Sequence, residues 1–398
     1  MQRFVVVGGG LAGLTAANVL AGEGRKIVLL EQSEHLGGRA ITRQDRGYLL
    51  NLGPHALYAG GVAARTLRQW NVPFAGKQPD TGSASFVLNE GRMYPLIQTT
   101  RQLLSTRLFG VSEKFQAARI LQQLVSGRAA EGESMEDWIC HRVRSPRVRN
   151  FVAMLARVST YSADHARLSA SAALDQFRRA KAHGVLYLDG GWQTLVAGLE
   201  RRARSLGVEI RLGEAIESLE AIRTDGVILA VPPSSVQRLT GRSLPLIYPV
   251  RAACLDLGLR MLPKGSARVA FGMDQPLYLS VHSAVARLAP AGAALVHLVK
   301  YLAGVSDPAA DRQELERFAD LAIPGWHDHA EVVRFMPNIT VTPAIFSPQG
   351  RPGVDALGLP GVALAGDWVG SEEMLADAAV ASALRAADMV QRQGLLAA

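Results

Sequence analysis

A glycine turn near the amino terminus constrains the fold more than any other feature of this sequence. The spacing Gly8-x-Gly10-x-x-Gly13 follows an apolar, β-branched run at 3–7 and precedes an apolar segment at 11–21. A second apolar run, 26–30, ends at Glu31. A buried strand, a glycine turn, a helix and a second buried strand thus follow one another within about 30 residues, which predicts a βαβ unit with parallel strands.

The three glycines have the spacing of a dinucleotide-binding turn, in which each has its own task. Gly8 permits the tight turn, Gly10 lets the backbone approach a pyrophosphate, and Gly13 lets the helix pack closely on the strand. The first helical residues, Leu11 and Ala12, offer unpaired N–H groups to phosphates. The alternative is a structural turn without a cofactor, but the strand before it and the helix after it favour the cofactor.

A carboxylate at the end of the second strand points to the same kind of ligand. Glu31, followed by Gln32, can accept hydrogen bonds from ribose hydroxyls. It would also repel a 2′-phosphate, which disfavours NADP at this site.

Length and cysteine content narrow the class of protein. A chain of 398 residues predicts two or three structural units. Hydrophobic residues make up 48% and charged residues 20%, which excludes an intrinsically disordered chain. The two cysteines, Cys140 and Cys254, form no CxxC pair, so we expect neither a disulfide scaffold nor a metal site.

The net charge of +8 comes mainly from arginine, since only six of the 43 basic residues are lysine. One interpretation is the arginine-rich codon usage of a genome rich in G and C; the other is an anionic partner. We favour the first, because no dense basic run is interleaved with aromatic residues, and we expect no nucleic-acid partner. Weak peripheral contact with an anionic membrane, giving access to a lipophilic substrate, is a further prediction. The oligomeric state is left open.

No segment has the pattern of a membrane span or a signal peptide. The longest uncharged stretch, 4–22, is interrupted by glycines throughout. We therefore expect a cytoplasmic protein that is soluble or associated with a membrane surface.

Periodicity predicts α/β segments at the beginning, middle and end of the chain. Helices are expected at about 99–127, 134–143, 146–158, 166–182, 192–206, 311–321 and 375–392. Strands are expected at 208–212, 225–231 and 362–365, and strands of an antiparallel sheet at 253–260, 267–272, 277–283, 293–302 and 329–336. A doubly wound α/β domain interrupted by insertions explains this order.

A second glycine motif takes the interpretation further. Gly37, Gly38 and Arg39 follow Glu31 by six to eight positions. This combination closely resembles the double-glycine signature of the flavoprotein superfamily that includes amine oxidases, protoporphyrinogen oxidases and phytoene desaturases. The glycine pair allows another close backbone approach, and Arg39 can place a planar, permanently charged group near a diphosphate. The alternative to a cofactor motif is a glycine loop with an exposed arginine. The spacing to Glu31 favours the cofactor motif.

Later segments extend the resemblance over nearly the whole chain. Gly53-Pro54-His55 is similar to the segment that passes near the isoalloxazine ring in this superfamily. Gly366-Asp367 resembles the carboxyl-terminal flavin motif, whose aspartate lies near the ribityl chain and diphosphate. The resemblance implies that the helix start near Met374 and Leu375 points at the pyrimidine end of the ring, where its dipole favours an anionic reduced flavin. Ile210 is a further expected cofactor contact.

The resemblance also implies a domain organisation. It consists of a Rossmann-type FAD-binding domain at 1–59, 188–240 and 350–398, interrupted by an α+β substrate-binding domain at 60–187 and 241–349. The substrate domain has an antiparallel sheet and a helical part at about 96–187. FAD is expected to be non-covalent, because no cysteine or histidine stands in a recognisable covalent-flavin motif.

As function, the resemblance implies an FAD-dependent oxidase or dehydrogenase acting on a hydrophobic small molecule such as an isoprenoid or a tetrapyrrole. A hydride would pass to flavin N5, with later reoxidation by oxygen, a quinone or another acceptor. A flavin amine oxidase is the first alternative. It is weakened because the stretch 250–259, where amine oxidases often place a lysine near N5, has none, and Lys300 lies on a later strand.

A second alternative is a non-enzymatic binding protein, since the GDP-dissociation inhibitors resemble this fold without flavin chemistry. The intact glycine turn, Arg39 and Gly366-Asp367 argue for a real cofactor site instead.

His55 is the best candidate for a catalytic base, because its motif lies near the ring in the superfamily. A histidine that only packs and forms hydrogen bonds is the alternative. His282, Tyr278 and Lys300 are expected to be structural. A helical stripe predicts either a lipophilic tunnel or a plain core; it consists of Leu103, Leu104, Leu108, Phe115, Ile120 and Leu121.

Overall fold

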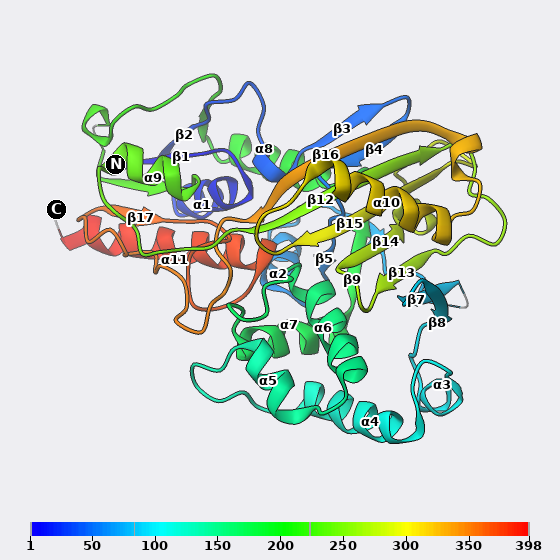
Figure 1. The fold of residues 1–398 in the computed structure, drawn as a ribbon. Coiled ribbons are helices and arrows are strands. Elements are labelled where there is room, and N and C mark those ends of the chain that lie inside the picture. Colours follow the sequence, from blue (N-terminus) through cyan, green and yellow to red (C-terminus); the bar gives the residue numbers. More distant parts are fainter. Residues whose placement is uncertain (1, 83, 223, 397–398) are drawn as a thin grey trace.

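Five parallel strands form one sheet of the computed structural model, which describes residues 2–82, 84–222 and 224–396 (Figure 1). The strand order is β10-β2-β1-β11-β17. The bounds are β1 (Arg3–Val7), β2 (Lys26–Leu30), β10 (Glu209–Arg211), β11 (Gly226–Leu229) and β17 (Val362–Leu364). The apolar runs of β1 and β2 are buried on both faces, which is why they read as continuous rather than alternating hydrophobic segments.

Helices cover both faces of this parallel sheet. Phe4 and Val6 of β1 pack into one core, whose helices are α1 (Leu11–Gly22), α2 (Val62–Gln69), α8 (Gln193–Ser205) and α11 (Leu375–Leu396). Val5 and Val7 alternate to the opposite core with α9 (Pro233–Thr240). The result is a doubly wound α/β arrangement built from three separate stretches of the chain.

A seven-stranded sheet forms the second layer, in the order β16-β12-β15-β14-β13-β7-β8. The bounds are β7 (Ser85–Asn89), β8 (Arg92–Pro95), β12 (Val250–Leu259), β13 (Val269–Gly272), β14 (Leu277–Val281), β15 (Ala294–Leu302) and β16 (Ala330–Thr342). Its pairs are antiparallel except β13 with β7, which run parallel. Helix α10 (Pro308–Ala322) packs on one face through Leu315 and Phe318.

Five helices form a lobe between β8 and β9, seen at the bottom of Figure 1. They are α3 (Thr100–Ser105), α4 (Val111–Ser126), α5 (Met135–Arg142), α6 (Pro146–Thr160) and α7 (Ala170–His183). Side-chain oxygens of Thr99, Ser134, Ser145 and Ser169 cap four of their amino termini. The core of the lobe includes Trp138 and Phe151, both nearly fully buried.

Short elements join these parts. β3 (Thr42–Asp45) and β4 (Tyr48–Asn51) form a hairpin, and β5 (Leu57–Tyr58), β9 (Val185–Leu188) and β6 (Gly76–Lys77) form a three-stranded sheet. Four short 3₁₀ helices complete the described elements, at Gly38–Ala40, Leu219–Ala221, His282–Ala284 and Trp326–His329.

The predicted fold class is confirmed, and most predicted elements lie within a few residues of the observed ones. The helix expected at 99–127 is in fact two helices, because the chain turns at 106–110 and α4 begins after Gly110. Helix α2, inside the range predicted as substrate domain, packs with α11 in the core of the parallel sheet. Residues 1, 83, 223, 397 and 398 of the predicted domain ranges lie outside the described residues.

Among the helices formed by the described residues, we find none with the length and hydropathy needed to cross a bilayer.

Candidate functional site

A cavity of about 590 Å³ lies where the parallel sheet meets the seven-stranded sheet. Four of its lining residues stand at or just beyond the carboxyl ends of parallel strands, namely Val7, Leu30, Ala230 and Ala365. This is the edge at which doubly wound sheets bind their ligands. The opposite wall comes from β12, β15 and β16 of the second sheet.

The glycine turn forms the floor of this cavity beside α1. Gly8 has φ +102°, and its N–H donates to the carbonyl of Leu30 at 2.7 Å. A Cβ at Gly13 would lie 1.8 Å from the carbonyl oxygen of Gly8, so only glycine lets α1 pack here. A Cβ at Gly10 would meet no protein atom closer than 3.9 Å and would occupy the space at the cavity wall.

Glu31 is held by the backbone at the end of β2. The N–H of Gly9 donates to its carboxylate at 2.6 Å, and the N–H of Ser33 donates at 2.9 Å. Gln32 and Glu214 line the cavity beside it. The carboxylate is therefore oriented before any ligand arrives, as a ribose-binding group requires.

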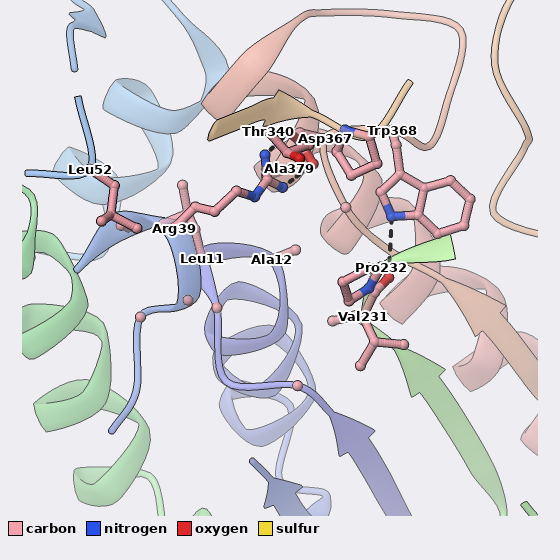
Figure 2. A pocket seen from close by; sticks show the side chains of 18 of the residues that line it. Leu11, Ala12, Arg39, Leu52, Val231, Pro232, Thr340, Asp367, Trp368 and Ala379 are labelled. Atoms are coloured by element: carbon pink, nitrogen blue, oxygen red, sulfur yellow. Dashed lines mark hydrogen bonds and ion pairs between the residues drawn. The ribbon is translucent and has the colours of Figure 1, made fainter. Parts of the chain in front are cut away.

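The double-glycine segment packs against the first turn. Gly37 has φ +120°, and its N–H donates to the carbonyl of Gly9 at 2.9 Å. The next residues turn Arg39 across the cavity, where it donates to both carboxylate oxygens of Asp367 (Figure 2). Arg39 also donates to the carbonyl of Val341. Two segments 328 positions apart in the chain thus meet at one charged pair.

The segment after β17 returns to the cavity through a bend at Gly366, whose φ is +153°. The N–H of Gly366 donates to the hydroxyl of Ser382 on α11, and the indole N–H of Trp368 donates to the carbonyl of Val231 (Figure 2). Arg351, which the sequence analysis did not single out, donates to backbone carbonyls from Asp367 to Glu373. This arginine fixes the loop that leads into α11, whose first residues line the cavity.

The wall contributed by the second sheet is uncharged. Its lining residues are Ala252, Cys254, Val299, Ile339, Thr340 and Val341. Burial, together with the neighbouring Asp256, raises the pKa of the Cys254 thiol well above its usual range. The thiol therefore stays protonated and is a poor nucleophile, in keeping with the expectation of non-covalent FAD.

His55 lies at the junction of the two halves of the cavity. Burial lowers its pKa to about 4; the charges of His297 and Arg39 add to the shift, and the backbone of Gly53 and of Arg39 opposes it. In the neutral ring, Nδ1 carries the proton and donates to the Gly53 carbonyl at 3.0 Å, which leaves Nε2 as an acceptor. The ring packs edge-on against Trp192 with 4.9 Å between centroids.

A buried polar network lies beside the apolar wall, on the same face of the second sheet, because Asp256 and His297 are each two residues from a lining residue of their strand. His297 Nδ1 lies 2.5 Å from a carboxylate oxygen of Asp256, which also pairs with Arg334. Although burial opposes it, these two partners hold the pKa of Asp256 below its usual range. His282 stacks on Tyr187, whose hydroxyl lies 2.8 Å from that of Tyr278.

Neither His282 nor Tyr278 reaches the cavity wall, so the structure places both in the interior as expected. Lys300 also points away. Its neighbour Val299 lines the cavity, whereas Lys300 pairs with Asp311 and Glu314 on α10, across the sheet.

Most of the predicted site residues line one cavity. They are Gly8, Gly10, Leu11, Ala12, Glu31, Gln32, Gly37, Gly38, Arg39, Pro54, His55, Gly366, Asp367 and Leu375. Four others do not line it, namely Gly13, Gly53, Ile210 and Met374. Met374 is buried in the core of the helical lobe. Ile210 packs beside β2, and it is Ile216, six residues later, that lines the cavity.

Several lining residues were not predicted from the sequence, among them Tyr161, Trp192, Ile216, Pro232 and Trp368. Trp192 had a signal, because it follows the glycine pair of 190–191, both with positive φ. Trp368 also had a signal, because it directly follows the Gly366-Asp367 motif. In the local sequence, nothing separates Tyr161, Ile216 and Pro232 from core residues.

The residues present fit an FAD group. Gly10 leaves room for a close approach, and the amino terminus of α1 presents unpaired N–H groups to phosphates. Trp192, which lines the cavity, has a buried indole N–H without a hydrogen-bond partner among the described residues. Gly8, Glu31 and Asp367 would hold the pyrophosphate turn, ribose and ribityl regions respectively.

Comparison with known proteins points the same way. Residues 11–248 match the family described as flavin containing amine oxidoreductase. The L-amino-acid oxidases of Naja atra and Demansia vestigiata are 60% and 53% identical to this chain over 58 residues. Each of these matches spans 14% of this chain and 11% of the length of the relative.

Solved structures share the fold over nearly the full chain. An oxidoreductase from Methanosarcina mazei has a TM-score of 0.78 at 16% identity, covering 97% of this chain and 100% of its own. A protoporphyrinogen oxidase-like protein from Exiguobacterium sp. 255-15 has a TM-score of 0.72 at 18% identity, covering 99% of each chain. Putrescine oxidase bound to putrescine has a TM-score of 0.70 at 14% sequence identity, and the match covers 98% of this chain and 99% of the other.

Proposed function

The chain belongs to the family of flavin-containing amine oxidoreductases and is FAD-dependent, and from that premise we propose that it oxidises or desaturates a hydrophobic small molecule, of the isoprenoid or tetrapyrrole class. When bound, FAD supplies the acceptor for the hydride that leaves the substrate carbon. The remaining tasks fall to this chain's own residues: binding, orienting and excluding water.

One observation carries the choice of substrate class: the cavity wall from the second sheet is uncharged. The charged lining residues all come from the nucleotide-binding half, namely Glu31, Arg39, Glu214, Arg238 and Asp367. Burying an ammonium or a carboxylate against the opposite wall would leave that charge without a partner, which is costly. An apolar substrate meets no such penalty, and gains from the burial of its own surface.

His55 is proposed to assist as an acceptor rather than as a strong base. Its Nε2 can accept a hydrogen bond while its Nδ1–H is held by the Gly53 carbonyl. With a pKa near 4 the ring is neutral at physiological pH and adds no positive charge to an apolar site. Tyr161, whose hydroxyl donates to the carbonyl of Pro54, closes the cavity beside it.

A flavin amine oxidase is the second candidate, favoured by the local identity to L-amino-acid oxidases. Two features of the described residues argue against it. The only lysine on β12 or β15 is Lys300, which pairs with α10 on the far side of the sheet. The lining arginine nearest the second sheet, Arg39, already pairs with Asp367 and is not free to bind a substrate carboxylate.

Anaerobic reduction of the purified holoprotein tests the proposal. The oxidised protein should show flavin bands at about 370 and about 450 nm. We expect isoprenoid or porphyrinogen compounds to bleach the longer-wavelength band, and amines or L-amino acids to leave it unchanged. Bleaching by amines or amino acids alone would replace this proposal with the second candidate. A colourless protein that does not take up FAD would favour a binding protein of the GDP-dissociation-inhibitor type.

A further inference from the structure

Three large apolar side chains project from the outer end of the helical lobe. Leu104 on α3 and Val111 and Phe115 on α4 are 66%, 75% and 74% exposed. We call these three residues the apolar tip. Figure 1 shows α3 and α4 at the end of the molecule opposite the nucleotide-binding helices, with α6 and α7 between α4 and α2.

The residues of the tip take no part in packing α4 into the lobe. Helix α4 packs into the lobe through Ala117, Ile120 and Leu124, all nearly fully buried. Val111 and Phe115 are four positions apart and lie together on another face of the helix. Lys114 Nζ donates to the carbonyl of Leu104 at 2.6 Å, which fixes α3 beside the start of α4. The tip is therefore a preformed part of a folded lobe.

The helical stripe predicted from the sequence contains both buried and exposed residues. Leu103, Leu108 and Ile120 are core residues of the lobe, whereas Leu104 and Phe115 are exposed. Leu121 is partly buried against the same core, and none of the six residues lines the cavity described above.

The segment that carries the tip has an excess of basic residues. Residues 99–128 contain five basic residues and one acidic residue. Arg101, Arg107 and Arg119 are exposed and have no ion-pair partner among the residues that the structure describes. The single acid, Glu113, is engaged: its carboxylate accepts from the N–H of Gly110 and the hydroxyl of Ser145. The tip is thus an apolar centre with an uncompensated basic rim.

We propose that the apolar tip and its arginines dock this protein on an anionic lipid bilayer. Exposed aliphatic and aromatic side chains enter the interfacial layer, and Arg101, Arg107 and Arg119 contact headgroup phosphates. A second copy of the same face is a poorer occupant, because the two basic rims would repel each other. The inference deepens the proposed function, since a lipophilic substrate dissolves in the bilayer, but the surface argument does not depend on turnover.

Co-sedimentation of the holoprotein with vesicles tests this docking. Vesicles containing phosphatidylglycerol should pellet the protein at low salt and less of it at physiological salt, and vesicles of phosphatidylcholine alone should pellet little. Phe115→Glu should reduce binding to the anionic vesicles about tenfold or more. Val305→Glu is the matched control, because Val305 is fully exposed in the loop between β15 and α10.

A variant with Arg101, Arg107 and Arg119 all changed to Gln separates charge from apolar insertion. It should bind anionic vesicles at low salt about tenfold or more weakly, because each basic residue near an anionic surface contributes independently. Circular dichroism and the flavin spectrum check that each variant is folded. These substitutions lie outside the cavity, so oxidation of a detergent-dispersed substrate should be unchanged.

Three results would overturn the docking proposal. They are equal pelleting with neutral and anionic vesicles, a Phe115→Glu loss no larger than that of Val305→Glu, and a tip-dependent dimer by light scattering that does not bind vesicles. Vesicle binding without oxidation of any apolar compound would instead count against the proposed function alone. Oxidation of an apolar compound without vesicle binding would count against the docking proposal alone.

Discussion

Arg39 and Asp367 form a two-point ion pair between residues 328 positions apart in the chain. Nη1 and Nη2 of Arg39 donate to the two carboxylate oxygens of Asp367 at 2.7 and 2.6 Å. Asp367 is nearly buried while Arg39 is partly exposed on the cavity side. The pair therefore closes the nucleotide-binding half of the molecule by joining its first and last segments, and it does so at the wall of the cavity.

Asp367→Asn should weaken both the fold and cofactor retention. The amide keeps the volume but loses the charge and one acceptor, so we expect a loss of about 1–2 kcal/mol in the free energy of unfolding, less than for a fully buried pair. Urea unfolding and the ratio of flavin to protein absorbance measure the two effects. Asp388→Asn is the control, because Asp388 pairs with Arg392 on the exposed face of α11. Equal effects of the two substitutions would contradict the role given to Asp367.

Two glycines of the same turn should respond differently to alanine. In Gly13→Ala the new methyl would lie 1.8 Å from the Gly8 carbonyl, so the flavin-free protein should lose about 2 kcal/mol or more in the free energy of unfolding. In Gly10→Ala the methyl meets open space at the cavity wall. That variant should stay within about 1 kcal/mol of the parent.

Flavin titration completes this comparison. Gly10→Ala should bind FAD about tenfold or more weakly, because its methyl occupies the close approach to the pyrophosphate. Gly22→Ala, later in α1, is the control, since its Cβ would lie 3.8 Å from the nearest atom, on Arg202. Unchanged FAD affinity in Gly10→Ala would mean that the cofactor does not lie against this turn.

His55 should make stability fall on acidification. Its pKa is about 4 in the folded protein and about 6.5 when unfolded, so the unfolded chain takes up a proton first as the pH drops. Stability from this group is complete above about pH 6.5 and is lost progressively toward pH 4. His55→Gln should therefore show a shallower decline of the free energy of unfolding in that window, measured by urea unfolding. His35→Gln, at an exposed position with no ion pair among the described residues, should retain the parent slope.

Lys300 should matter for stability and not for redox chemistry. Lys300→Gln would leave the buried carboxylate of Asp311 without its cation, at a cost of about 2 kcal/mol in the free energy of unfolding. The rates of flavin reduction and of reoxidation by oxygen should match those of the parent, because the side chain points away from the cavity. Lys264→Gln, at an exposed position, is the stability control. A large fall in the reoxidation rate of Lys300→Gln would revive the amine-oxidase candidate.

The predicted cofactor residues with special backbone requirements were found where the sequence placed them. Gly8, Gly37 and Gly366 have positive φ, and Glu31 directly follows its strand. Such positions tolerate few residue types, so the sequence carries a strong signal for them. The cavity wall was different: Cys254, Val299 and Ile339 are ordinary strand residues, and nothing in their local sequence separates a lining side chain from a core one.

The sequence alone determined the doubly wound fold, the glycine turns and the family, because these depend on short-range patterns of apolar and glycine residues. Only the tertiary structure decided which sheet closes the cavity, that Arg39 meets Asp367, and that Lys300 points to α10 rather than to the site. It also separated Leu104 and Phe115 from the core of their own helices. The physical reason is that strand and helix periodicity fixes which residues share a face, while the partner of that face is set by contacts between segments far apart in the chain.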